Sequence, residues 1–240
     1  MEEPPRYKRI VLKVSGEALR GDKASGICDK VLNEIAVELK EIHQLGIEIG
    51  LVIGGGNFFR GTRSHNLDID RASADYMGML ATIMNGIALR DVLEKKGLVV
   101  RLVSALEIKG VAEPFVSKRV IRHLEKGRLV IFAAGTGNPF FTTDTAAALR
   151  AIEIKADILL KATNVEGVFA ADPKLVQDDK QVKFDHISYK EVLSRELKIM
   201  DSTAFTLCRE HRLPIKVFDI TRRGNILKAI TDKNIGTSIN

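Results

Sequence analysis

Short apolar runs alternate with amphipathic segments along almost the whole chain, and this alternation limits the folds that the chain can adopt. Apolar residues recur at helical spacing between the runs, as at Leu32, Ile35, Leu39 and Ile42. Strands that alternate with helices favour a parallel sheet with helices on both faces. We therefore predict an α/β protein, a three-layer α/β/α sandwich with a mainly parallel central sheet. The predicted strands are residues 10–14, 47–53, 98–103, 129–134, 158–161 and 215–218.

The predicted helices lie between these strands. Residues 68–96 form one long helix or two in succession, and Gly78 and Gly86 inside this segment indicate close backbone approaches. Residues 114–126 are expected to form a helix that begins at Pro114, and residues 201–212 another. No linker-like segment interrupts the pattern. We expect one compact domain over residues 1–240, with two lobes of about 1–156 and 157–240.

Composition narrows the classes of partner. The chain has 37 basic and 31 acidic residues, a formal charge of +6, which suits an anionic ligand. The basic residues are scattered, so nucleic acid is not the expected partner. Cys28 and Cys208 are far apart and the histidines lack metal-ligand spacing, which argues against disulfides and zinc. No apolar run has the length of a membrane span, and we expect a cytoplasmic protein.

A small, hydroxyl-rich loop follows the predicted strand at 129–134. It runs from Gly135 to Thr145 and leads into a helix that opens with alanines. Ligands bind at the carboxyl ends of strands in α/β sheets, and the free N–H groups of a helix start favour an anion. The alternative is a capped helix after a glycine turn.

Two more stretches have the character of phosphate sites. Three glycines, residues 54–56, follow the second strand, and Arg60 comes shortly after them. Backbone N–H groups without a Cβ in the way can approach phosphate, although a flexible turn is the alternative. Lys13 ends the first strand beside Ser15 and Gly16, where it could neutralise a phosphoryl group or simply face water. No P-loop motif is present.

Polar groups at two further places suit a nucleoside. Asp75 could accept hydrogen bonds from ribose hydroxyls, or could face solvent on its helix. The segment 161–173 combines Lys161, Asn164, Phe169 and Asp172, a mixture that suits a purine pocket but is also found in ordinary β-hairpins. In a parallel sheet all of these stretches lie along one edge. Two anionic ligands side by side at this edge indicate phosphoryl transfer.

At several of these stretches the chain resembles the amino-acid-kinase-fold enzymes, and within them the bacterial uridylate kinases. The resemblance extends from Tyr7 to the C-terminus, and Met200-Asp201 before Ala204-Phe205 also fits it. The run at 135–144 is specific to uridylate kinases rather than to the wider fold. The matching stretches are 13–19 (Lys-Val-Ser-Gly-Glu-Ala-Leu), 52–57 (Val-Ile-Gly-Gly-Gly-Asn), 77–82 (Met-Gly-Met-Leu-Ala-Thr), 135–144 (Gly-Thr-Gly-Asn-Pro-Phe-Phe-Thr-Thr-Asp) and 161–163 (Lys-Ala-Thr).

The resemblance implies a reaction and a set of site residues. ATP and UMP would give ADP and UDP, in pyrimidine nucleotide biosynthesis, with Mg²⁺ carried by ATP rather than by the protein. The implied catalytic residues are Lys13, Arg60, Asp144, Lys161 and Asp201. The implied ATP-binding residues are Lys13, Val14, Ser15, Gly16, Gly56, Arg60, Thr163, Asn164, Phe169 and Asp172. The implied UMP-binding residues are Gly55, Asp75, Thr136, Gly137, Asn138, Pro139, Phe140, Phe141, Thr142 and Thr143.

Assembly and regulation are implied by the same resemblance. Relatives are homohexamers built as trimers of dimers, and many are inhibited by UTP. Many also carry Gly-Phe-Gly in the loop after the first strand, which is tied to activation by GTP. Ala24 and Ser25 stand at that place here, so the expectation of GTP activation does not carry over. Two alternatives remain open: a kinase of the same fold acting on a carboxylate or carbamate, and a nucleotide-sensing regulator without turnover.

Overall fold

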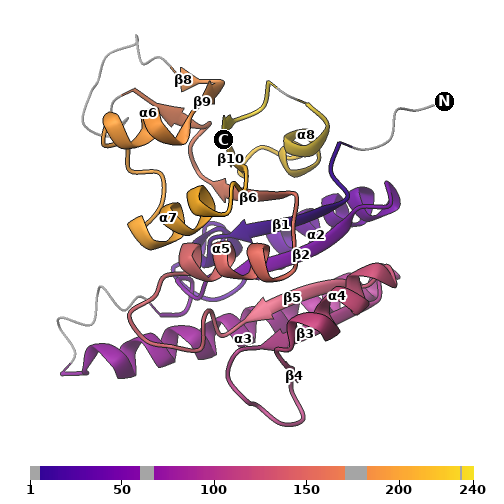
Figure 1. The fold of residues 1–240 in the computed structure, drawn as a ribbon. Coiled ribbons are helices and arrows are strands. Elements are labelled where there is room, and N and C mark those ends of the chain that lie inside the picture. Colours follow the sequence, from indigo (N-terminus) through magenta and orange to yellow (C-terminus); the bar gives the residue numbers. More distant parts are fainter. Residues whose placement is uncertain (1–5, 60–67, 171–182, 233) are drawn as a thin grey trace.

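A nine-stranded sheet runs through the molecule in the order β4-β3-β5-β2-β1-β6-β10-β11-β9 (Figure 1). The computed structural model describes residues 6–59, 68–170, 183–232 and 234–240. The strands of this sheet are β1 (Arg9–Val14), β2 (Glu48–Ile53), β3 (Val100–Ser104), β4 (Glu113–Pro114), β5 (Leu129–Ala133), β6 (Ile158–Thr163), β9 (His186–Ile187), β10 (Ile215–Asp219) and β11 (Thr237–Ile239). The helices are α1 (Gly16–Leu19), α2 (Asp29–Gln44), α3 (Arg71–Lys95), α4 (Ser117–Glu125), α5 (Thr143–Glu153), α6 (Tyr189–Ser194), α7 (Ser202–Glu210) and α8 (Asn225–Thr231).

The sheet is mainly parallel, as the sequence predicts. Within it β10 and β11 are antiparallel, and every other described pair of strands is parallel. The central strand β1 lies between β2 and β6, and its Lys13 is directly opposite Lys161 of β6. Strands from both sides of residue 157 therefore belong to one hydrogen-bonded sheet.

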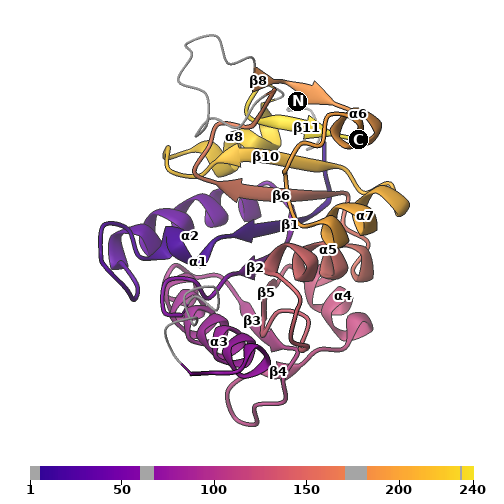
Figure 2. The same ribbon diagram turned by 90° about the vertical axis from the view of Figure 1, so that its left-hand side faces the viewer.

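Alternation along the strands creates a core on each face of the sheet. Ile10, Leu12 and Val14 of β1 are buried with residues of α2, α3 and α8, whereas Val11 faces α5. Figure 2 shows α2 and α3 on one side of the sheet and α4, α5 and α7 on the other. The three-layer α/β/α architecture is thus confirmed.

Glycines let two of the strand-end loops press together. A Cβ on Gly16, just after β1, would lie 2.5 Å from the carbonyl oxygen of Gly54, which follows β2. A Cβ on Gly55 would lie 2.5 Å from the carbonyl oxygen of Gly78 in α3. Real Cβ atoms do not come this close, so these positions accept only glycine without a shift of the backbone. The loops after β1 and β2 are therefore packed against each other and against α3.

One prediction about the helices was wrong. Pro114 does not begin a helix: it lies in β4 at the edge of the sheet, where a missing N–H costs no ladder hydrogen bond, and α4 begins at Ser117. The backbone of Gly78 does make a close approach, since a Cβ on Gly55 would lie 2.5 Å from its carbonyl oxygen, although a Cβ on Gly78 itself would meet nothing within 4 Å. At Gly86 the prediction holds, since a Cβ would lie 2.6 Å from Leu102 Cδ1. Residues 71–95 form one continuous helix.

A second, two-stranded sheet lies outside the main one. In it β7 (Val168–Phe169) pairs antiparallel with β8 (Lys183–Phe184). Across the described parts of the chain, no helix combines the length and the apolar character that crossing a membrane requires.

Candidate active site

Two lysines on neighbouring strands share one carboxylate. Lys13 of β1 and Lys161 of β6 are paired in register, and Asp144 lies in the first turn of α5. Lys161 Nζ donates to Asp144 Oδ2 at 2.5 Å, and Lys13 Nζ lies 2.9 Å from Asp144 Oδ1 without the alignment of a hydrogen bond. All three side chains are largely buried, at 13–15% exposure. The arrangement holds two cations side by side at the carboxyl ends of the central strands.

The charges of this cluster depend on one another. Burial raises the pKa of Asp144, but Lys13 and Lys161 outweigh it and hold the pKa below its usual range. Burial lowers the pKa of Lys161, and Asp144 opposes that effect only in part. Asp144 is therefore firmly ionised at neutral pH. Lys161 also donates to the carbonyl oxygen of Ile199 at 2.5 Å, which fixes its direction.

The triple-glycine loop (residues 54–56) lies directly beside this cluster. The N–H of Gly54 donates to the carbonyl oxygen of Val14 at 3.0 Å, which ties the loop to the end of β1. A Cβ on Gly54 would lie 3.5 Å from Thr143 Oγ1, so the loop also approaches the start of α5. Ser15 precedes α1 in an extended conformation, and its side chain makes no cap hydrogen bond. Half-buried backbone at Ser15 and Gly56, next to two lysines, suits a phosphate group.

The threonine-rich loop (residues 135–143) leaves β5 with an unusual backbone. Ala134 and Phe140 have positive φ values of 60° and 72°, and Gly135 and Gly137 lie in the same left-handed region. Such values in non-glycine residues need support from surrounding contacts. One support is Asp75 of α3, whose Oδ2 accepts the N–H of Phe140 at 2.8 Å.

Asp75 has a second partner. Arg71 Nε lies 3.1 Å from Asp75 Oδ1 and 3.0 Å from Oδ2. Beyond this contact, Phe140 and Phe141 expose their rings to solvent. The loop thus presents exposed apolar rings, and it leads at its other end into the start of α5, which carries Asp144.

Asp201 ties the far end of this loop to α7. It caps α7 by accepting the N–H of Ala204 at 2.9 Å, and it accepts hydrogen bonds from Thr142 Oγ1 at 2.5 Å and Thr145 Oγ1 at 3.0 Å. Thr142 in turn caps α5 through the N–H groups of Asp144 and Thr145. These contacts favour a role for Asp201 in positioning the start of α5, which carries Asp144.

The residues predicted to bind a nucleoside lie at the ends of β6 and β7. Thr163 is the last residue of β6, and its carbonyl oxygen accepts the N–H of Ile220 after β10 at 2.8 Å. Asn164 is exposed, and Phe169 is half-buried in β7. β7 pairs with β8, which lies beyond the segment 161–173, so the structure shows no hairpin within the described part of that segment. Arg60 and Asp172 lie outside the described residues.

Several side chains support these loops and were not singled out in the sequence. Arg150 of α5 is buried, donates to the carbonyl oxygen of Gly135 at 3.2 Å and lies 3.9 Å from the centroid of the Phe115 ring. Thr82 and Asn85 of α3 contact the backbone at the ends of β5 and β2. Buried polar residues at apolar helix positions are the signal that could have marked them.

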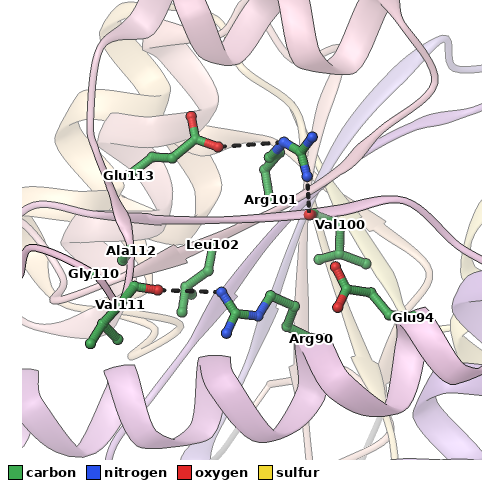
Figure 3. Close-up of a pocket in the computed structure, with 9 residues that line it drawn as sticks. All are labelled: Arg90, Glu94, Val100, Arg101, Leu102, Gly110, Val111, Ala112 and Glu113. Atoms are coloured by element: carbon green, nitrogen blue, oxygen red, sulfur yellow. Dashed lines mark hydrogen bonds and ion pairs between the residues drawn. The ribbon is translucent and has the colours of Figure 1, made fainter.

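A cavity of about 440 Å³ lies elsewhere, between α3 and the strands β3 and β4 (Figure 3). Three of its charged groups have local partners: Arg90 donates to the carbonyl oxygen of Val111, and Arg101 lies 3.4 Å from Glu113. None of the predicted site residues lines it. Among residues that the structure describes, no group of three or more His, Cys, Asp or Glu side chains could hold a metal ion.

Comparisons with known proteins agree on one family. The model of the amino acid kinase family matches residues 8–219. A UMP kinase from Bacillus anthracis is 39% identical, with a TM-score of 0.93, over 98% of this chain and 96% of its own. A UMP kinase from Ureaplasma parvum is 36% identical, with a TM-score of 0.92, over 98% and 99%. A uridylate kinase from Archaeoglobus fulgidus is 27% identical, with a TM-score of 0.74, over 96% and 99%.

Proposed function

The chain belongs to the amino acid kinase family, and from this premise we propose that it is a UMP kinase. It transfers the γ-phosphoryl group of ATP to UMP and releases ADP and UDP, a reversible step in the formation of UTP and CTP. The observation that carries the proposal is the position of the Lys13–Asp144–Lys161 cluster. It lies where the triple-glycine loop meets the start of α5, into which the threonine-rich loop leads.

The chemistry needs alignment and charge neutralisation more than covalent participation. An oxygen of the UMP phosphate is already anionic, so it can attack the γ-phosphorus as the bond to the β-phosphate oxygen breaks. Negative charge accumulates on the transferring group, and Lys13 and Lys161 can offset it. Asp144 keeps both ammonium groups in place before the nucleotides bind, so that little reorganisation is needed during the reaction.

In this proposal the two substrates bind to different lobes of the protein. ATP binds toward the lobe of residues 157–240, with its phosphates over Lys13, Val14, Ser15, Gly16 and Gly56 and its nucleoside near Thr163, Asn164 and Phe169. UMP binds in the lobe of residues 1–156, against Gly55, Asp75 and the threonine-rich loop. The exposed rings of Phe140 and Phe141 favour this assignment, because they offer an apolar surface near the loop hydroxyls. Arg60 and Asp172 remain proposed ATP ligands on the resemblance alone.

Mg²⁺ enters the reaction with ATP in this proposal. Carried by ATP rather than by a protein site, it would neutralise part of the negative charge of the phosphates. The lysine pair supports this view, because a site that already holds two cations beside one carboxylate has little attraction for a protein-bound divalent ion.

A substrate panel tests the function directly. ADP release is measured with ATP, Mg²⁺ and, in turn, UMP, CMP, dTMP, AMP and carbamate. Rapid turnover of UMP alone is expected. CMP turned over as fast as UMP would contradict the specificity, and carbamate as the preferred acceptor would favour another kinase of this fold. Binding of UMP or UTP without any turnover would favour a nucleotide-sensing regulator, against which the intact charged cluster argues.

UTP inhibition follows from the chemistry of the acceptor. UTP contains the UMP group, so it can occupy the threonine-rich loop and place its additional phosphates where those of ATP belong. UTP should then compete with UMP in steady-state kinetics. GTP activation is not part of the proposal, since Ala24 and Ser25 replace the residues tied to it.

A homohexamer built as a trimer of dimers is the proposed assembly. The support is an exposed apolar face on α3, which consists of Tyr76, Met77, Leu80, Met84 and Ile87. Sedimentation velocity would test the assembly, and a monomer would contradict it.

Cytoplasmic location is also proposed. Cys28 and Cys208 are unpaired, which suits a reducing compartment, and both substrates are cytoplasmic metabolites. Fractionation of cells that produce the protein would test this.

A further inference from the structure

Helix α3 passes beneath the starting points of both the triple-glycine loop and the threonine-rich loop. Thr82, Asn85 and Gly86 lie at spacings of three and four residues, so they share one face of this helix. All three are buried. Thr82 and Asn85 are polar positions in an apolar interior, where a hydrogen bond is needed to offset the cost of burial.

Asn85 is bonded to the triple-glycine loop and to the residue that follows it. Its Nδ2 donates to the carbonyl oxygen of Gly54 at 2.8 Å and to Asn57 Oδ1 at 2.7 Å. Asn57 Nδ2 returns a hydrogen bond to Asn85 Oδ1 at 2.8 Å and donates to the carbonyl oxygen of Gly26 at 3.0 Å. The side-chain amides thus use all four of their N–H groups, and Asn85 is 0% exposed. Such a closed network allows the loop only one arrangement.

Thr82 is bonded to the start of the other loop. Its Oγ1 accepts the N–H of Ala134 at 2.7 Å and donates to the carbonyl oxygen of Met79 at 2.7 Å. Ala134 is the residue at which the chain leaves β5 with a φ of 60°. An alanine in the left-handed region is strained, and a buried hydrogen bond to its N–H helps to hold it there.

Gly86 allows the helix to pack closely against the sheet near these two contacts. A Cβ on Gly86 would lie 2.6 Å from Leu102 Cδ1 and 3.5 Å from Ile131 Cγ2, so the helix packs against β3 and β5 without an intervening side chain. Close packing of this kind transmits a displacement of the helix directly to the strands. The positions of Asn85 and Thr82 are therefore fixed relative to the strands from which the loops emerge.

We propose that Asn85 and Thr82 are positioning residues for phosphoryl transfer. Asn85 positions the triple-glycine loop, in which Gly56 binds ATP phosphates and Gly55 faces UMP, and Thr82 positions the threonine-rich loop that binds UMP. The proposal rests on the proposed function for the identity of the two substrates. It adds that one rigid helix sets the two loops relative to each other through one polar side chain for each. Neither residue touches a substrate or the lysine cluster in this role.

A crossed kinetic experiment tests the proposal. Asn85→Ser shortens the side chain and breaks its bond to the Gly54 carbonyl, and Thr82→Val removes the hydroxyl at nearly constant volume. Asn85→Ser should lower kcat and raise the KM for ATP about tenfold, with a smaller rise in the KM for UMP because Gly55 belongs to the same loop. Thr82→Val should raise the KM for UMP about tenfold and leave the KM for ATP nearly constant. Thr82→Ser, which restores a hydroxyl, should recover most of the UMP affinity.

Leu89→Val provides the matched control. Leu89 is buried in the same helix, and it contacts neither loop through a hydrogen bond. This variant should lower the melting temperature and leave both KM values unchanged. If Asn85→Ser leaves the KM for ATP unchanged, or if Thr82→Val shifts both KM values equally or neither, the proposal is overturned. Should Asn85→Ser fail to fold, Thr82→Val and its serine rescue decide the question alone. Absence of turnover in the unaltered protein would instead contradict the proposed function.

Discussion

Lys13 Nζ and Asp144 Oδ1 lie 2.9 Å apart, although one residue ends the central strand β1 and the other belongs to the first turn of α5. The same carboxylate accepts Lys161 Nζ at 2.5 Å. Two cations on paired strands repel each other, and Asp144 makes their proximity stable. The helix start therefore supplies a counter-charge that keeps both ammonium groups directed toward the loops.

Loss of Lys13 should affect the chemical step more than substrate binding. Lys13→Ala removes a cation that is expected to stabilise the transferring phosphoryl group, and kcat should fall on the order of 10²- to 10³-fold. The KM for UMP should change much less. Steady-state kinetics with saturating ATP measure both constants. Lys8→Ala, at an exposed position on the same segment, is the control. An unchanged kcat in Lys13→Ala would refute the phosphoryl role.

Loss of Asp75 should weaken the binding of UMP and leave the binding of ATP nearly unchanged. Its carboxylate accepts the N–H of Phe140, a residue with a φ of 72°, so Asp75→Ala removes a support of the threonine-rich loop. We expect the KM for UMP to rise roughly tenfold or more, because both the loop and a ribose contact are lost. Calorimetry with a non-hydrolysable ATP analogue should give a nearly unaltered dissociation constant. Weaker binding of that analogue would place Asp75 on the wrong side of the site.

Loss of Glu38 should lower the stability of the protein. Nothing in the local sequence marks this residue as important. This buried carboxylate on α2 accepts the N–H groups of Gly224 at 2.8 Å, Ile226 at 2.9 Å and Leu227 at 3.4 Å. Glu38→Ala leaves these donors at the start of α8 without a partner, which should reduce the free energy of unfolding by about 2 to 4 kcal/mol. Urea unfolding measures it. Glu41→Ala, at an exposed position on the same helix, should cost less than about 0.5 kcal/mol. Equal effects of the two substitutions would show that the capping contact is unimportant.

Lys216 should make stability depend on pH in the alkaline range. Burial lowers the pKa of this lysine from 10.5 to about 8, with Asp232 opposing the shift and Arg6 and Lys183 adding to it. Between these values the unfolded chain keeps a proton that the folded protein has lost. Unfolding then requires proton uptake, and the free energy of unfolding rises with pH by up to about 1.4 kcal/mol per unit. Below pH 8 both states hold the proton and this contribution is constant.

The variant Lys216→Met isolates that contribution from other alkaline titrations. Cys208, whose pKa burial raises to about 12, acts in the opposite direction in both proteins. Urea unfolding at pH 7.5, 8.5 and 9.5 should therefore give a difference between the two proteins that grows in favour of the unaltered protein. A difference that stays constant over this range would show that Lys216 does not titrate there.

The parts of the fold that depend on local pattern were predictable from the sequence. Apolar runs such as residues 129–134 mark buried strands by themselves, and the parallel arrangement follows from the helices between them. The site could be placed at the carboxyl ends of these strands for the same reason. Pro114 shows the limit of local signals. A proline begins helices often, yet here the partner strand β3 makes an extended edge position the better one.

Contacts between distant segments could not be predicted in this way. Glu38 and Gly224 are separated by 186 positions, and nothing near Glu38 distinguishes it from the other acidic residues of α2. The same holds for Asn85, because its role depends on hydrogen bonds to Asn57 and Gly54, which belong to another part of the chain. The resemblance to a family supplied candidate substrate ligands such as Asp75. It did not supply the buried residues that hold those ligands in place.

The strand order has a mechanical consequence for the reaction. The threonine-rich loop leaves β5 and the nucleoside-binding segment leaves β6, with β2 and β1 between them. Neighbouring strands are held about 4.8 Å apart by their ladders, so the two anchoring points stand roughly 14 Å from each other and cannot slide. The sheet thus fixes the spacing between the segments that bind the two nucleotides. Any closing movement that brings the phosphates into contact must come from the loops and helix starts that follow the strands. The spacing of the strands themselves stays constant.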